Sequence, residues 1–128
     1  MFLNGEAMRG RPLHENVADA PFLGPARTAP RYRFYSVRDE FPGLARAMSA
    51  PGYKIEGELY EISEETLRDR LLPNEPPELE LGVIELEDGT AAFSMLLRSE
   101  QLGSPELLDI SEHGGWRNYM GDRLRPPL

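Results

Sequence analysis

The sequence contains no cysteine, and this absence removes several chemistries at once. Disulfide bonds, zinc sites built from thiolates and a cysteine nucleophile are all excluded. Histidine is almost as scarce, because His14 and His113 are the only two in 128 residues. A histidine-rich metal site is therefore not expected, and no dinucleotide or phosphate-loop motif is present. We predict a protein without a metal and without a cofactor.

Long apolar runs and an excess of positive charge are also missing. No stretch approaches the ~20 apolar residues of a membrane-spanning helix. Asn4, Gly5 and Glu6 interrupt the apolar start before it could serve as a signal peptide. The formal net charge is −8, whereas nucleic acids and anionic membranes are bound through Lys and Arg. We therefore expect a cytoplasmic protein whose partners include neither nucleic acid nor a membrane.

The residues that are present fit one folded unit. A chain of 128 residues, 40% of them hydrophobic, suffices for one core, so we assign residues 1–128 to a single domain. Twelve prolines and twelve glycines are spread evenly, a spacing typical of short strands joined by turns. The predicted fold is α+β: a small mixed β-barrel of about six or seven strands with short flanking helices.

The expected strands are short apolar stretches bounded by turn residues. They cover 1–4, two stretches within 22–35, 43–47, 53–62, 79–86 and 91–97. In the stretch 53–62, Ile55, Gly57 and Leu59 alternate with charged residues, which predicts that these three face inward and that Glu58 faces solvent. In 79–86 the apolar residues change from odd to even positions, which predicts a β-bulge near Gly82.

Helices are expected at two places. Ser63 is a typical N-cap, and the helix that it begins should run to about Leu72, where Pro73 stops it. A second short helix is expected around Trp116, as a cap on the barrel. Residues 125–128 are predicted to be a frayed end.

The first candidate site is the loop that follows the first strand. Its residues are Asn4, Gly5, Glu6, Ala7 and Met8. A strand that runs into a glycine turn exposes successive backbone N–H groups, and such a group of amides can hold a carboxylate or another oxyanion. Spacing alone also allows an ordinary strand-to-loop turn.

Candidates for proton transfer lie elsewhere in the chain. Glu75 belongs to an acidic loop with Glu78 and Glu80, and a carboxylate in a pocket can act as a general base when burial raises its pKa. His14 can exchange protons near neutral pH. The alternatives are a solvated acidic loop and a surface histidine. The glycines before Trp116 indicate either a lid over a pocket or, as we favour, a structural cap.

Several stretches together resemble known proteins. Residues 1–10, 24–44 and 55–62 resemble the γ-glutamylcyclotransferase-like fold family. The chain is more similar to one branch of that fold, the C-terminal domain of allophanate hydrolases, over almost its whole length, here without an amidase portion. The stretches that carry this second resemblance are 27–30 (RTAP), 82–89, 109–111 (DIS) and 114–119 (GGWRNY).

The resemblance implies a pocket lined by the first loop. Residues 4–8 would bind the substrate there, and Glu75 or His14 would transfer protons. The implied ligand is a small amide, carbamate or urea-like compound, and a separate amidase is the implied protein partner. Two alternatives stay open: a non-catalytic module that binds a ligand or an amidase, and a γ-glutamylcyclotransferase that forms 5-oxoproline.

Two features argue against cyclotransferase activity. Glu6 puts a negative charge where a substrate carboxylate would approach. Pro73, Pro76 and Pro77 surround Glu75 and are expected to hold it outside the pocket. We therefore expect no appreciable formation of 5-oxoproline.

Overall fold

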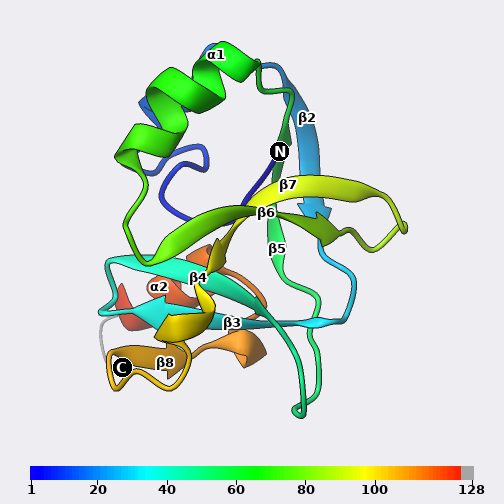
Figure 1. The fold of residues 1–128 in the computed structure, drawn as a ribbon, viewed down its shortest axis with the longest axis vertical. Helices are drawn as coiled ribbons and strands as arrows, with labels where there is room; N and C mark the ends of the chain where they lie inside the picture. Colours follow the sequence, from blue (N-terminus) through cyan, green and yellow to red (C-terminus); the bar gives the residue numbers. More distant parts are fainter. Residues whose placement is uncertain (125–128) are drawn as a thin grey trace.

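The computed structural model describes residues 1–124, so the expected frayed end at 125–128 lies outside the described residues. The described chain forms eight strands in two sheets, together with short helices (Figure 1). One sheet has the order β1 (Phe2–Leu3), β5 (Glu56–Tyr60), β2 (Phe22–Arg27). The other has the order β6 (Leu79–Glu85), β7 (Ala91–Leu97), β4 (Phe41–Arg46), β3 (Tyr32–Val37), β8 (Leu107–Asp109). The predicted α+β class is confirmed.

The two sheets do not close into a barrel within residues 1–124. All neighbouring strands pair antiparallel except β4 and β7, which run parallel and meet at Leu44 and Leu96. The sheets are linked by a single bridge between Thr28 and Leu86. The expected strands within 22–35 are present as β2 and β3, and the expected strand at 43–47 is part of β4.

The predicted alternation in β5 is wrong at its second half. Ile55 and Gly57 are buried as expected, but Glu58 is buried too and Leu59 is only half-buried. A buried carboxylate is stable only when it is hydrogen-bonded. Glu58 meets this condition, because it accepts hydrogen bonds from the Arg9 backbone N–H (2.9 Å) and the Tyr60 hydroxyl (3.0 Å).

The predicted bulge near Gly82 is also wrong. Residues of β6 and β7 pair one to one without a break, from Leu79 opposite Leu97 to Glu85 opposite Ala91. The apolar residues change from odd to even positions because Leu81 and Val83 lie on the outer face of the strand. Their exposed fractions are 36% and 50%. Apolar residues therefore lie on both faces of β6, without any insertion in the strand.

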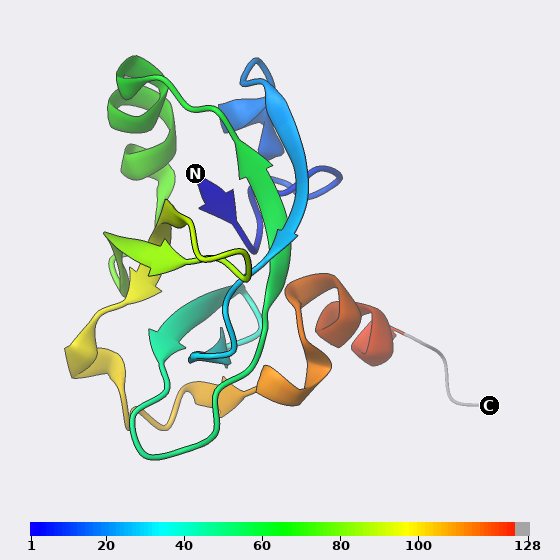
Figure 2. The ribbon, with the colours of Figure 1, turned by 90° about the vertical axis from the view of Figure 1, so that its right-hand side faces the viewer.

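Helices lie on opposite sides of the strands (Figure 2). The first begins as predicted, because Ser63 accepts a hydrogen bond from the backbone N–H of Thr66. It comprises α1 (Glu64–Thr66), a π-helical stretch Leu67–Leu71 and a 3₁₀ turn Leu72–Asn74 that contains Pro73. The other helix is α2 (Trp116–Leu124), and single 3₁₀ turns cover His14–Val17, Ser99–Gln101 and Ser111–His113.

Apolar side chains form a large core and a smaller one. The large core is centred on Phe34, Leu44 and Ile55 and includes Trp116, which is fully buried. The indole is therefore a structural anchor, as favoured above. The smaller core consists of Val37, Phe41, Leu79, Met95 and Leu97. In the described part of the chain, no helix has the length and apolar character needed to cross a membrane.

Candidate functional site

The first loop turns sharply directly after β1. Its turn is closed by hydrogen bonds from the Met8 N–H to the Gly5 carbonyl (3.1 Å) and from the Leu13 N–H to the Glu6 carbonyl (2.9 Å). Gly5 is required by space, because a Cβ there would lie 2.6 Å from Cδ of Pro42 in β4. The loop is therefore pressed against the second sheet.

Hydrogen-bond donors in this loop are left without acceptors. Within residues 1–124, the backbone N–H groups of Gly5, Glu6 and Ala7 donate no hydrogen bond. The side-chain nitrogen Nδ2 of Asn4 is buried and likewise has no partner among the described residues. Buried polar groups are almost always paired in folded proteins, so an unpaired donor needs an explanation such as a bound ligand or water.

Glu75 lies near the first loop, although it comes from a distant part of the chain. It follows the 3₁₀ turn Leu72–Asn74 in an extended conformation, with φ −83° and ψ 145°. Burial raises the pKa of its carboxyl to about 7. In the part of the chain that the structure describes, no hydrogen bond or ion pair reaches that carboxyl.

These groups share a cavity of about 120 Å³, which we call the first-loop cavity. It brings Asn4, Gly5, Glu6 and Ala7 together with Glu75, as the resemblance implied. The prolines do not hold Glu75 outside, since Pro76 itself lines the wall beside it. The other lining residues are Phe2, Leu3, Leu13, Glu40, Phe41, Pro42, Leu79, Ser94 and Met95.

The carboxylate of Glu6 is neutralised within the chain. Both of its oxygens accept hydrogen bonds of 2.9 Å from the Arg11 guanidinium, and the Trp116 indole N–H donates to it at 3.3 Å. The other glutamate of the wall, Glu40, is paired with Arg38. Among the three glutamates that line the cavity, Glu75 is thus the one with no cation beside it in the described chain.

Two of the predicted residues lie elsewhere. The Nδ1 atom of His14 is 3.0 Å from the Ala7 carbonyl oxygen, and His14 lines neither of the two cavities described here. Its place is behind the loop, which it holds in position. Met8 lines the second cavity instead.

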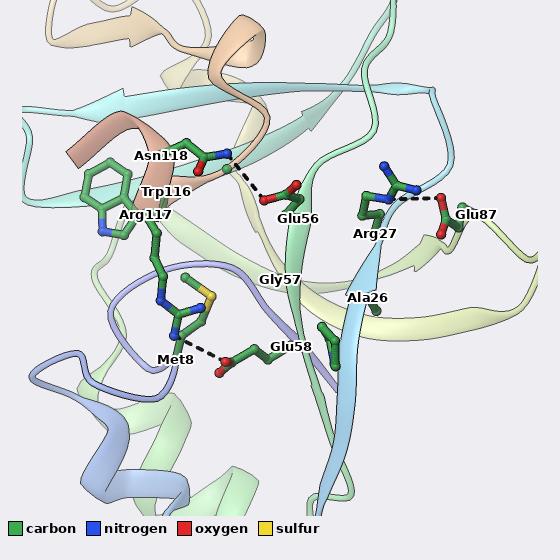
Figure 3. A pocket seen from close by; sticks show the side chains of 12 residues that line it. Met8, Ala26, Arg27, Glu56, Gly57, Glu58, Glu87, Trp116, Arg117 and Asn118 are labelled. Carbon is green, nitrogen blue, oxygen red and sulfur yellow. Dashed lines mark hydrogen bonds and ion pairs between the residues drawn. The ribbon is translucent and has the colours of Figure 1, made fainter. Parts of the chain in front are cut away.

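That second cavity, the charged pocket, encloses about 500 Å³ between β2, β5 and the first turn of α2 (Figure 3). Four of its five charged side chains are paired with one another: Arg117 with Glu58 (3.2 Å) and Arg27 with Glu87 (3.3 Å). The fifth, Glu56, accepts a hydrogen bond from the Asn118 side-chain amide (3.4 Å). Burial alone would raise the pKa of Glu58, but hydrogen bonds from the Arg9 N–H, Tyr60 and Arg117 lower it. The alternation in β5 gave no signal for this buried carboxylate.

The two cavities therefore differ in what they offer a ligand. The charged pocket is larger, but both of its guanidinium groups and two of its three carboxylates are already paired with each other. The first-loop cavity is lined both by Asn4, whose Nδ2 has no partner among the described residues, and by Glu75, whose pKa is raised to about 7 by burial. Donors can bind an oxyanion or carbonyl oxygen, and such a carboxyl can give or take a proton. Within residues 1–124, no three His, Asp or Glu side chains are arranged so that they could hold a metal ion, and this includes the three glutamates of the first-loop cavity.

The sequence and the fold were compared with those of known proteins. Residues 1–121 match the family model of the allophanate hydrolase C-terminal domain. A protein specific to uropathogenic Escherichia coli is 31% identical, with a TM-score of 0.84 over 94% of this chain and 93% of that one. The allophanate hydrolase of Kluyveromyces lactis is 25% identical, with a TM-score of 0.87 over 95% of this chain. The chain spans only 21% of that enzyme.

A more distant structure shares the fold alone. An AIG2-like protein of Mus musculus is 22% identical, with a TM-score of 0.59 over 83% of this chain and 80% of that one. No curated protein matches the chain. The expected resemblance is confirmed, and the chain belongs to the family of the allophanate hydrolase C-terminal domain.

Proposed function

We propose that this protein binds a small carbamate or urea-like anion in the first-loop cavity and that Glu75 transfers a proton to it. The observation that carries the proposal is the buried, unpaired Nδ2 of Asn4 in the same cavity as the unpaired carboxyl of Glu75. Together with the free N–H groups of residues 5–7, Asn4 offers donors on one side and Glu75 an acid or base on the other.

The size of the cavity favours a compound of few atoms. Pockets for drug-sized ligands measure roughly 300–1,000 Å³, whereas the first-loop cavity measures about 120 Å³. A carbamate or urea-like compound suits this volume better than a γ-glutamyl dipeptide does. Of the alternatives considered from the sequence, the cyclotransferase reaction is therefore the least supported.

The pKa of Glu75 suits it to donate a proton at neutral pH. A group with a pKa near 7 is partly protonated there, and a bound anion raises the pKa of a neighbouring carboxyl further. In the proposed step the ligand oxygens accept hydrogen bonds from the loop, and Glu75 donates its proton to the carbamate nitrogen. The C–N bond breaks, its electron pair goes to nitrogen, and carbon dioxide leaves. Solvent then reprotonates Glu75.

The binding part is tested with malonamate, which is the analogue of a urea carboxylated on one nitrogen. A CH₂ group replaces that nitrogen, so the C–N bond of the proposed step is absent. Isothermal titration should show binding by the unaltered protein and by Glu75→Gln. Asn4→Leu should weaken this binding at least tenfold, about 1.4 kcal/mol, since it removes the buried donor. Asn118→Ala, which alters the charged pocket, is the matched control and should bind like the unaltered protein. Equal binding by Asn4→Leu would refute the assigned cavity.

The proton-transfer part is tested by stopped-flow measurement of carbamate breakdown, with ammonium carbamate as substrate and a pH indicator as readout. The protein should accelerate breakdown, and Glu75→Gln should lower that acceleration by about 10²–10⁴-fold. Binding of malonamate without any acceleration would instead establish the non-catalytic alternative. Release of 5-oxoproline from γ-glutamyl dipeptides, lost in Glu75→Gln, would establish the cyclotransferase alternative.

A further inference from the structure

The outer edge of β6 is open over a short stretch. β6 is the terminal strand of its sheet, and its even-numbered residues bond to β7, as shown by the 2.8 Å bond from the Leu86 N–H to the Thr90 carbonyl. The backbone N–H and C=O groups of successive residues point alternately toward and away from the paired strand. Those of the odd-numbered residues of β6 therefore point outward, away from β7. Glu85 confirms this direction: its carbonyl accepts from Ala29 and its N–H donates to the Tyr32 hydroxyl.

The open stretch is bounded at both ends. Residues 27–29 cover the edge at Glu85, and the Leu79 N–H is bonded to the Pro76 carbonyl. Leu81 and Val83 remain between these ends, and no residue in the described part of the chain pairs with their outward N–H and C=O groups. These two residues are arranged symmetrically about Gly82.

The same stretch carries apolar side chains on its outer face. Val83 lies opposite Phe93 of β7, and their side chains are 50% and 53% exposed. Leu81 continues the row at 36% exposure. Natural edge strands are usually protected by lysine, proline or a bulge, because open backbone groups pair readily with another strand. β6 has none of these three protections.

From this geometry we propose that β6 pairs antiparallel with β6 of a second copy of this chain, with the two-fold axis passing through Gly82. In this register Leu81 lies opposite the Val83 of the other copy, and Val83 opposite its Leu81. Both open residues are then used, in four backbone hydrogen bonds. The apolar rows of the two copies join on one face of a continuous sheet.

Charge permits this contact despite the net charge of −8. The glutamates along and beside β6 are each paired within their own chain: Glu78 with Arg38, Glu80 with Arg98 and Glu85 with Arg31. The pairing is confined to residues 81–83, because residues 27–29 already cover the edge at Glu85, so no glutamate lies within the paired stretch. A strongly basic or acidic partner would find no unpaired charge along the edge.

The interface is small, so the dimer should be weak, with a Kd on the order of 10–100 μM. Sedimentation across concentration should show a mass that rises from 14.4 kDa toward twice that value. Val83→Pro should abolish the rise, because proline removes an outward N–H that β7 does not use. Val83→Lys should do the same by placing charge on the edge. Met48→Lys, at an apolar side chain 87% exposed elsewhere, is the matched control and should dimerise normally.

A second measurement fixes the register. The chain has no cysteine, so Val83→Cys introduces a unique thiol. In the proposed dimer the two thiols lie about 8 Å apart on neighbouring strands. A short bismaleimide should therefore link Val83→Cys chains into dimers and should not link Met48→Cys chains. A single species of 14.4 kDa up to about 1 mM would overturn the proposal. Dimers that persist in folded Val83→Pro would overturn it equally.

Discussion

Three glutamates line the first-loop cavity, and their neighbours give them different properties. Glu6 forms an ion pair with Arg11, and Glu40 forms one with Arg38. Glu75 is half-buried and has no cation beside it among the described residues, and this partial burial raises its pKa to about 7. The residue type is the same in all three cases. Glu75 is therefore suited to proton transfer because, unlike the other two glutamates, it has no cation that would stabilise its charged form.

At Gly5 the space between the loop and the second sheet decides which residue is allowed. Gly5→Ala would place a methyl group 2.6 Å from Cδ of Pro42, so the loop or the strand must move. We expect a loss of about 1–3 kcal/mol in the free energy of unfolding, and weaker malonamate binding because the loop amides shift.

The control for Gly5→Ala is Gly121→Ala on α2. A Cβ there meets nothing within 4 Å, and alanine favours a helix, so stability should rise by about 0.5–1 kcal/mol. Urea unfolding of both variants measures the two changes. A neutral Gly5→Ala would show that the loop does not press on Pro42.

Elements were predictable where local residues alone decide their form. Ser63 caps its helix as expected, because the cap and the N–H that it binds are three residues apart. β5 was predicted with Glu58 in solvent, because its burial depends on Arg9 and Arg117, which are 49 and 59 residues away. The meeting of Glu75 with the first loop likewise came from the family resemblance, since spacing along the chain cannot place two distant segments in one cavity.

The helix that leads to Glu75 depends on its cap. Ser63→Ala leaves the Thr66 N–H without its acceptor at 3.1 Å and should cost about 0.5–2 kcal/mol of stability. Ser99→Ala is the matched control, because within the described residues the Ser99 hydroxyl makes no hydrogen bond. Thermal unfolding of the two variants compares them. Equal transition temperatures would mean that the cap adds nothing to the folded state.

At the scale of the whole molecule, the buried Glu58 and the half-buried Glu75 make stability depend on pH in opposite directions. The folded pKa of Glu58 is lowered, so its contribution is present above the unfolded value of 4.5 and is lost as pH falls through the folded pKa. The folded pKa of Glu75 is raised from 4.5 to about 7, so stability falls as pH rises between these values. Just above pH 4.5 the contribution of Glu58 is nearly complete and the loss of stability due to Glu75 is only beginning.

We therefore predict a stability maximum on the acid side of neutrality, near pH 5, followed by a decline of about 1–3 kcal/mol toward pH 8. Glu75→Gln cannot ionise, so it should remove this decline, match the unaltered protein near pH 4 and exceed it at pH 8. Glu58→Gln should do the reverse: it should be less stable at pH 7 and approach the unaltered protein in acid. Glu64→Gln, at an exposed position, should leave the profile unchanged. Urea unfolding from pH 3 to pH 9 measures all four profiles. If the unaltered protein and Glu75→Gln both gave a flat profile between pH 5 and pH 8, the ionisation of Glu75 would not affect stability. Its pKa would then not be raised, and the proposal that Glu75 is the acid of the first-loop cavity would lose its main support.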